Sequence, residues 1–173
     1  MKRLLTVMFA LVLLSACASA TDTTTNTTDT AANTPASNPS AQSYAAFLPD
    51  PKLSPGDTLD VTTSDICVSG YSSKVRNVPQ SEKDQVYQEY GITSHAPGAY
   101  EIDHIISLEL GGSNSIKNLF PQSYTGDWNA HIKDKLENKL HSLVCAGTVD
   151  LKTAQQEIST DWIAAYQKYI GQP

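Results

Sequence analysis

The chain has 173 residues and a mass of 18.7 kDa, the size of one ordinary domain. Its 12 Lys and Arg residues against 18 Asp and Glu residues give a net charge of −6, which excludes a protein that binds nucleic acid through a broad basic surface. Apolar residues make up 40%, enough for a compact core but too few for a polytopic membrane protein.

The first 20 residues have the pattern of a signal peptide. A basic pair, Lys2-Arg3, precedes an apolar run over residues 4–14, which is too short to span a membrane but suits a signal-peptide core. The run ends in Leu14-Ser15-Ala16-Cys17, which is similar to a bacterial lipobox and predicts a lipid on Cys17. Ordinary cleavage after Ala18-Ser19-Ala20 is the alternative, and both alternatives predict export.

The lipobox pattern also predicts where the protein is delivered. Ala18, directly after the cysteine, is typical of outer-membrane delivery in Gram-negative bacteria. We therefore expect a lipoprotein on the periplasmic face of the envelope, attached by its N-terminal lipid anchor only, with a soluble periplasmic or secreted protein as the alternative. Residues 21–43 are rich in Thr, Asn and Ala and predict a flexible tether, so the folded domain is expected over residues 44–173.

Export also bears on the two cysteines of the domain. In an oxidising compartment we expect Cys67 and Cys145 to form a disulfide that closes a long loop. A metal site is the alternative, but it needs more ligands at suitable spacing, and the sequence has no C-x-x-C pair. The disulfide is therefore favoured.

The first part of the domain sequence predicts short elements and a hairpin. A strand is expected within residues 59–68 and a short helix over residues 81–90. Residues 100–110, rich in aromatic and β-branched side chains, predict a strand with an irregular middle. The Gly-Gly-Ser-Asn sequence at 111–114 predicts a turn, and residues 116–120 predict the return strand.

Two amphipathic helices are predicted to follow, over residues 127–144 and 151–170. In the first, apolar residues recur four, four and three positions apart, at Ile132, Leu136, Leu140 and Leu143. The second is expected to bury Ala154, Ile158, Trp162, Ile163 and Tyr166. A hairpin followed by two helices predicts the α+β class.

An ordered set of polar motifs lies between the hairpin and the first long helix: Tyr100-Glu101-Ile102-Asp103-His104, Gly111-Gly112, Asn118-Leu119-Phe120-Pro121 and Trp128-Asn129. In this order they resemble the HNH endonucleases, also called ββα-metal or His-Me finger nucleases, and in particular small exported bacterial HNH-domain proteins. The resemblance covers about residues 67–166. It implies a ββα-metal hairpin–helix unit with additional flanking helices, and hydrolysis of nucleic-acid phosphodiester bonds, with DNA favoured.

The resemblance implies roles for three of these residues. His104 matches the general base that takes a proton from water, a role that suits an imidazole with a pKa near neutrality. Asp103 matches a carboxylate ligand for a hard divalent ion, with Mg²⁺ expected and Mn²⁺ or another divalent ion as the alternative. Asn118 matches the asparagine that pins the loop and orients the histidine. Apart from the resemblance, Asp103 as a turn residue and His104 as a structural histidine remain open.

The second metal ligand is predicted from helical geometry, because the sequence lacks the family's Cys-His pair. At about 100° per residue, Asn129 projects within roughly 20° of Leu136, on the side expected to face the hairpin. His131 is rotated away from that side, towards solvent. We therefore expect Asn129 to hold the metal together with Asp103.

Two cationic residues are candidate phosphate contacts. Arg76 matches a position in the family that the chain resembles, and Lys133 lies about 40° around the helix from Asn129. Solvated surface positions are the alternative for both. For the whole protein two other functions stay open: a non-catalytic envelope lipoprotein that binds a partner through an HNH-like scaffold, and a phosphodiesterase that acts on another substrate.

Overall fold

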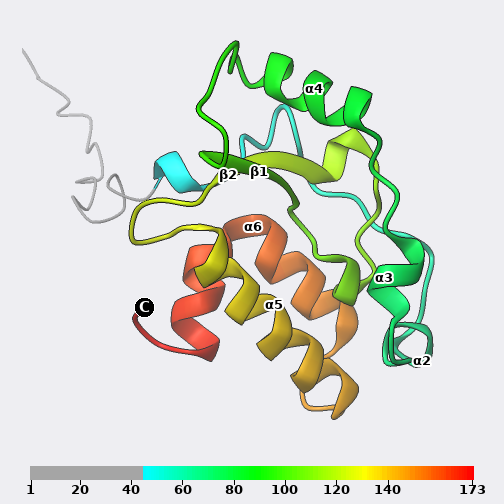
Figure 1. Cartoon of the computed structure of the whole chain (residues 1–173). Coiled ribbons are helices and arrows are strands. Elements are labelled where there is room, and N and C mark those ends of the chain that lie inside the picture. The colour runs from blue at the N-terminus through cyan, green and yellow to red at the C-terminus, as the bar shows by residue number, and fades with distance from the viewer. Residues whose placement is uncertain (1–44) are drawn as a thin grey trace, which may run out of the picture. The chain divides into compact units, whose positions relative to one another are not determined.

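The computed structural model describes residues 45–173, and the predicted signal peptide (1–20), Cys17 and the tether (21–43) lie outside the described residues. The described part is α+β. A two-stranded sheet lies between helix α4 (Gln80–Glu89) on one side and helices α5 (Ala130–Cys145) and α6 (Leu151–Tyr169) on the other (Figure 1). Within these residues no helix combines the length and the apolar character needed to cross a membrane.

The sheet consists of strands β1 (Tyr100–His104) and β2 (Leu119–Ser123). The remaining elements are short: the 3₁₀ helices η1 (Ala45–Phe47), η2 (Leu108–Leu110) and η3 (Ile116–Asn118), and the helices α2 (Thr63–Ile66) and α3 (Tyr71–Val75). The strands pair antiparallel, with Tyr100 opposite Ser123 and His104 opposite Leu119.

The hairpin is present, but its strands end at other residues than predicted. Strand β1 stops at His104 instead of residue 110, and β2 begins at Leu119 instead of residue 116. The cause of the later start is local, since the side chain of Ser115 caps η3 by accepting a hydrogen bond from the backbone of Lys117 at 3.3 Å. Side-chain hydrogen bonds to the backbone of this kind compete with strand pairing.

The prediction of a strand within residues 59–68 is wrong, because residues 63–66 of this segment form helix α2. The carboxylate of Asp65 accepts hydrogen bonds from the backbone N–H of Thr62 at 2.7 Å and from its hydroxyl at 2.6 Å. This arrangement satisfies a backbone donor at the start of the helix and stabilises a single helical turn. The nearest strand-like contact is an isolated bridge between Thr58 and Gly112.

The three predicted helices are confirmed, with small differences at their ends. Helix α4 lies within one residue of the prediction, and α5 begins three residues later than predicted because Asn129 caps it. All five apolar side chains that α6 was expected to bury are buried. Trp162 contacts Trp128 edge to face at 5.9 Å between ring centres, which packs α6 against the start of α5.

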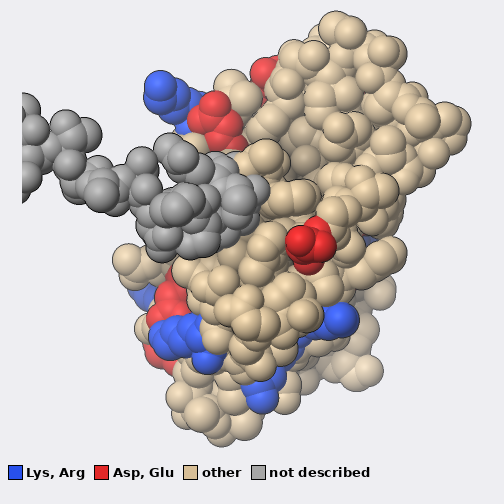
Figure 2. Space-filling view, turned by 90° about the vertical axis from the view of Figure 1, so that its left-hand side faces the viewer, with Lys and Arg blue, Asp and Glu red and all other residues tan. Residues whose placement is uncertain are grey.

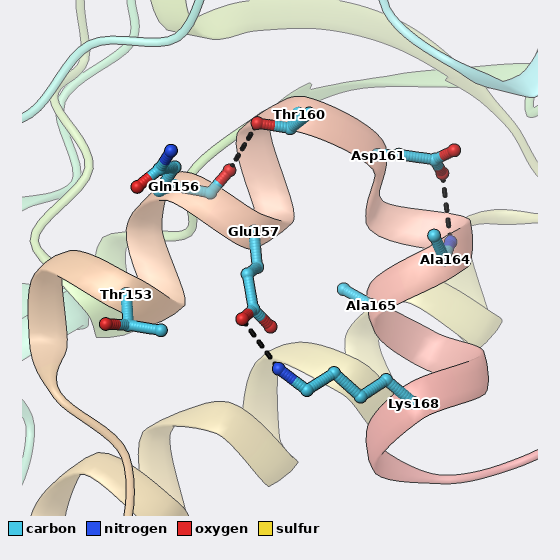
Figure 3. A pocket seen from close by; sticks show the side chains of 8 residues that line it. All are labelled: Thr153, Gln156, Glu157, Thr160, Asp161, Ala164, Ala165 and Lys168. Atoms are coloured by element: carbon cyan, nitrogen blue, oxygen red, sulfur yellow. Dashed lines mark hydrogen bonds and ion pairs between the residues drawn. The ribbon is translucent and has the colours of Figure 1, made fainter.

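Helix α6 is bent at Asp161, whose backbone leaves the helical conformation at φ −160° and ψ 93°. The Asp161 carboxylate accepts a hydrogen bond from the backbone of Ala164 at 2.9 Å and so restarts the helix after the bend (Figure 3). Lys168 and Glu157 form an ion pair across the bend at 2.6 Å (Figure 3).

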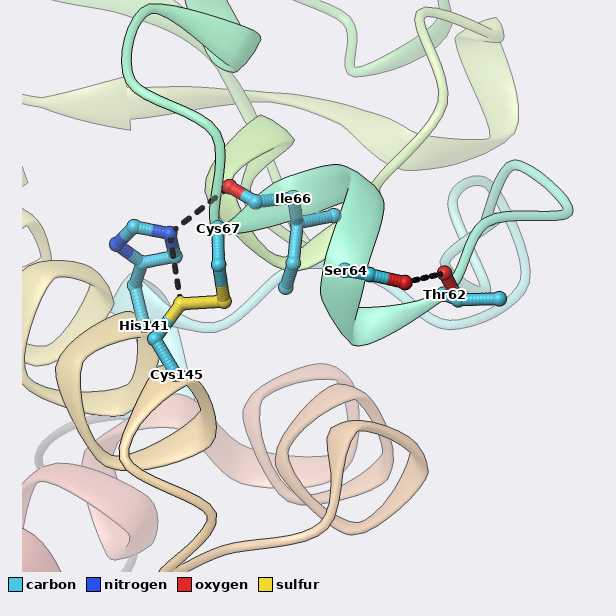
Figure 4. Close-up of a disulfide and its surroundings, with 6 residues drawn as sticks. All are labelled: Thr62, Ser64, Ile66, Cys67, His141 and Cys145. Carbon is cyan, nitrogen blue, oxygen red and sulfur yellow. Dashed lines mark hydrogen bonds between the residues drawn. A yellow bond between two sulfur atoms is a disulfide. The ribbon is translucent and has the colours of Figure 1, made fainter.

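The predicted disulfide between Cys67 and Cys145 is confirmed. It joins the residue after α2 to the last residue of α5, with 5.7 Å between the two Cα atoms (Figure 4). The two cysteines are 78 positions apart in the sequence, so the bond closes a long loop. Loop closure of this size restricts the unfolded chain more than the folded one.

We predict that the double variant Cys67→Ser/Cys145→Ser folds but loses about 2–5 kcal/mol of unfolding free energy, the cost of removing a loop-closing disulfide. Urea denaturation followed by circular dichroism measures the difference. The reduced wild-type protein should show the same loss. A difference below about 1 kcal/mol between the double variant and the oxidised wild type would contradict the prediction.

Candidate functional site

Asn118 holds the loop between the two strands. Its side chain is fully buried, and its Nδ2 donates hydrogen bonds to the carbonyl oxygens of Ile106 at 3.0 Å and Ser113 at 2.8 Å. Its Oδ1 accepts a hydrogen bond from the backbone N–H of Ile106 at 2.9 Å. One amide side chain therefore satisfies backbone groups on both sides of the loop, where strand pairing has ended.

Gly112 allows the loop to come this close to Asn118. A Cβ atom at position 112 would overlap the backbone carbonyl oxygen of Ile106 and would lie 2.8 Å from Asn118 Nδ2. Any larger residue would therefore push the loop away from the asparagine. Gly111 is required as well, because its backbone is left-handed at φ 76° and a Cβ there would lie 2.5 Å from Val61.

His104 lies at the end of β1 with 2% of its surface exposed, and its Nε2 is 3.2 Å from Oδ1 of Asn114. Two backbone contacts fix the orientation of this amide, since Asn114 Nδ2 donates to the carbonyl of Val75 at 2.7 Å and Oδ1 accepts from the N–H of Asn77 at 3.2 Å. A carbonyl oxygen only accepts hydrogen bonds. The hydrogen of the neutral imidazole must therefore lie on Nε2, which leaves a lone pair on Nδ1.

The surroundings of His104 keep the imidazole uncharged. Burial lowers the pKa of His104, and the nearby charges of Arg76 and Lys133 lower it further. The charge of Asp103 and the hydrogen bond to Asn114 act in the opposite direction but do not outweigh the burial. Nδ1 of the neutral imidazole is thus an unprotonated nitrogen with a lone pair.

The structure separates two residues that the sequence places in one centre. Asp103 and His104 are neighbours in β1, so their side chains point to opposite faces of the hairpin. Asp103 meets Lys133 of α5. His104 meets Asn114, which contacts the end of α3, where Arg76 is exposed. Arg76 therefore lies on the imidazole side, where a phosphate contact stays a prediction.

The position of Lys133 corrects the expected phosphate contact. Its side chain is fully buried, and its Nζ donates to Asp103 Oδ2 and to the carbonyl oxygen of His104, both at 2.7 Å, and to Glu137 Oε1. Burial alone would lower the pKa of Lys133, but the charges of Asp103 and Glu137 raise it above its ordinary value. All three ammonium hydrogens are used, so no N–H is left for a phosphate.

The contacts of Asp103 and Asn129 do not fit a pair of metal ligands. Asn129 Oδ1 accepts from the N–H of Ile132 at 3.3 Å, and its Nδ2 donates to the carbonyl of Gly126 at 2.9 Å, so its amide is used as a helix cap. One carboxylate oxygen of Asp103 is paired with the ammonium of Lys133. Hard divalent ions need several oxygen ligands, and here an ammonium holds the cation position beside Asp103.

Sequence reasoning missed two residues of this region. Asn114 contacts the imidazole directly, and its signal is the Gly-Gly-Ser-Asn turn, which by itself predicts only a reversal of the chain. Glu137 pairs with Lys133, and its signal is the four-residue spacing on one helix. A cavity of about 430 Å³ in the bend of α6 is lined by none of the predicted site residues (Figure 3).

No protein-family model, curated protein or solved structure matches the chain. The resemblance to the HNH endonucleases therefore rests on the sequence motifs quoted above. The geometry around His104 supplies the physical argument for function.

We predict that Lys133→Met lowers the unfolding free energy by about 3–5 kcal/mol, because it leaves two partly buried carboxylates without their shared cation. The matched control is Lys135→Met, an exposed lysine on the same helix, with an expected change within about 0.5 kcal/mol. Urea denaturation of both variants measures the contrast. Equal stability of the two variants would show that the buried ion pairs do not hold the structure together.

We also predict that His104 titrates below its ordinary pKa of 6.5 and that its neutral form carries hydrogen on Nε2. Nitrogen chemical shifts of the imidazole, followed by NMR against pH, measure both properties. The unfolded chain binds this proton more readily, so the contribution to stability is complete above pH 6.5 and is lost as the pH falls through the folded-state pKa. A pKa above 6.5, or hydrogen on Nδ1, would contradict the prediction.

Proposed function

We propose that this protein hydrolyses phosphodiester bonds of nucleic acids, with DNA favoured, and that His104 is its general base. The observation that supports the proposal most directly is the forced tautomer of His104, which presents an unprotonated Nδ1 while Nε2 is held by Asn114. A base that takes a proton from water needs such an unprotonated ring nitrogen.

The proposed chemistry uses residues on the imidazole side of the hairpin. Nδ1 of His104 takes a proton from a water molecule as the water oxygen attacks phosphorus. The bond to the leaving oxygen breaks, and this oxygen takes a proton from solvent to become a hydroxyl. The imidazolium that forms keeps its Nε2–H bond to Oδ1 of Asn114. The exposed guanidinium of Arg76 is the candidate contact for the phosphate oxygens. The lowered pKa of His104 keeps the base unprotonated at neutral pH.

The resemblance also implies a divalent ion, Mg²⁺ or Mn²⁺. Because Asp103 and Asn129 do not fit as its ligand pair, the proposal assigns only proton transfer and phosphate contact to residues of the chain. The plasmid assay described below tests whether a metal is required, by comparing Mg²⁺, Mn²⁺ and chelator.

The net charge of −6 predicts modest affinity for nucleic acid that falls as salt concentration rises. Figure 2 shows the face that is on the left in Figure 1, where basic side chains lie among acidic ones and large areas carry no charge. Export and a lipid anchor at Cys17 belong to the same proposal, and they would place the substrate outside the cytoplasm.

The second candidate function is a non-catalytic envelope lipoprotein that binds a partner. The observation that favours it is the burial of His104, which has only 2% of its surface exposed. A phosphodiesterase with another substrate is the third. It would use His104 as the same general base and would differ only in its substrate.

We predict that the protein relaxes supercoiled plasmid and that His104→Ala lowers the rate about 10²–10⁴-fold, the usual contribution of a general base. The matched control His131→Ala changes an exposed histidine of α5 and should keep the wild-type rate. The assay includes Mg²⁺, Mn²⁺ and chelator, with RNA and small phosphodiesters beside DNA. Activity on a small phosphodiester alone would favour the third function. An inactive wild type on all substrates would favour the partner-binding protein, and a fully active His104→Ala would refute the mechanism.

A further inference from the structure

The disulfide between Cys67 and Cys145 lies at the surface, beside an imidazole. Both cysteines are exposed. His141 Nε2 lies 3.1 Å from the carbonyl oxygen of Ile66 and 3.4 Å from Sγ of Cys145 (Figure 4). A carbonyl oxygen only accepts hydrogen bonds, so Nε2 carries a hydrogen, which also faces the sulfur. Thiols in solvent can therefore reach the bond, and an N–H group is in place to stabilise Cys145 as the leaving thiolate.

The segment that follows Cys67 is held weakly by packing. Helix α3, which begins at Tyr71, contains no buried residue. The hydroxyl of Tyr71 is enclosed, but it has no hydrogen-bond partner among residues 45–173. An enclosed polar group without a partner offsets part of the free energy gained by packing the ring. The attachments at the two ends of the segment therefore hold it more strongly than the packing between them.

At its far end the segment is attached to Asn114. The carbonyl of Val75 accepts a hydrogen bond from Asn114 Nδ2 at 2.7 Å, and the N–H of Asn77 donates to Asn114 Oδ1 at 3.2 Å. In the described part of the chain, these are the only hydrogen bonds between residues 68–78 and other segments. The same Oδ1 lies 3.2 Å from Nε2 of His104. The segment thus connects the disulfide at one end to the amide that orients the imidazole at the other.

We propose that the disulfide between Cys67 and Cys145 is a redox switch for the orientation of His104. When the bond is intact, it fixes the segment and, through Asn114, the tautomer of the imidazole. When the bond is reduced, the segment is released and the tautomer is no longer fixed. The effect on hydrolysis rests on the proposed function of His104, but the coupling between disulfide and imidazole does not. The oxidised form is the competent one, in agreement with the predicted export to an oxidising compartment.

The reduction balances with a dithiol as the reductant. One thiolate of the dithiol attacks Sγ of Cys67 and forms a mixed disulfide, and Cys145 leaves as a thiolate beside the N–H of His141. The second thiol of the dithiol then displaces Cys67. The dithiol becomes a disulfide, two electrons pass to the cysteine pair, and the two protons of the dithiol reach the cysteine thiols through solvent. The buried core includes no residue of α3, so the domain is expected to stay folded.

NMR of the oxidised and the reduced protein tests the coupling. In the oxidised protein we expect separate nitrogen shifts for His104, one protonated and one unprotonated. After reduction we expect the two shifts to be averaged by exchange between tautomers, and the amide of Asn77 to exchange its hydrogen about tenfold faster or more. The amide of Ile106, which Asn118 binds on the other side of the loop, is the internal control and should exchange at an unchanged rate.

Three further proteins separate the switch from a general loss of stability. Ile163→Ala removes a fully buried side chain of α6 and should destabilise the fold about as much as loss of the disulfide, but it should keep the separate shifts of His104. Insertion of Gly-Ser-Gly after Ser69 keeps the disulfide but lengthens the connection to α3, and it should give averaged shifts in the oxidised protein. Joining the two reduced sulfurs through one methylene group should restore the separate shifts.

Plasmid cleavage by the same samples shows what the switch does to the reaction. We expect the reduced protein to cleave about 10–100-fold more slowly, since a misplacement of about 1 Å costs about 10²-fold. Averaged shifts on reduction without cleavage in either form would support the switch and refute the proposed function. Separate shifts in a reduced protein that is folded by circular dichroism would overturn the switch, whatever the activity. If the reduced protein unfolds, separate shifts in the insertion variant would overturn it instead.

Discussion

The position of His104 depends on the hydrogen bonds and ion pairs of the buried Lys133 ammonium. The ammonium reaches from the first turn of α5 to the end of β1 and donates to a carboxylate of the strand, a carboxylate of its own helix and the carbonyl oxygen of His104. A buried charge is tolerated only when it is paired and all its donors are satisfied. This requirement fixes both the rotation of α5 about its axis and its position along the hairpin.

His104 is consequently held at both ends. Its backbone carbonyl is bound from the α5 side by Lys133, and its imidazole is bound from the α3 side by Asn114. Asn114 is itself oriented by two backbone groups, and the loop that carries it is held by Asn118. The tautomer of the imidazole is therefore a consequence of packing, since a rotation of the Asn114 amide would turn its NH₂ group towards the N–H of Asn77 and its oxygen towards the carbonyl of Val75.

The periodic parts of the structure could be predicted from sequence, and the parts set by individual side chains could not. The spacing of apolar residues predicted the helix over residues 127–144, because periodicity reports directly on burial. The buried face of α6 was also predicted, and the hairpin was predicted from strand-forming residues on both sides of a glycine turn. The strand ends depend instead on Ser115 and Asn118, whose side chains compete with the backbone for hydrogen bonds. The segment at 59–68 forms a helix for the same reason, since Asp65 binds the backbone of Thr62.

Lys133 shows how a correct geometric inference can lead to the wrong chemistry. Helical rotation placed it near the hairpin, as the structure has it, but a surface phosphate and a buried carboxylate are both partners for an ammonium, and spacing alone does not distinguish them. Burial decides between them, because an ammonium enclosed by Asp103 and Glu137 is neutralised within the protein. The cation beside the strand therefore belongs to the fold itself. The remaining positive side chain near the imidazole is that of Arg76, so under the proposed mechanism the phosphate would lie on the α3 side of the hairpin.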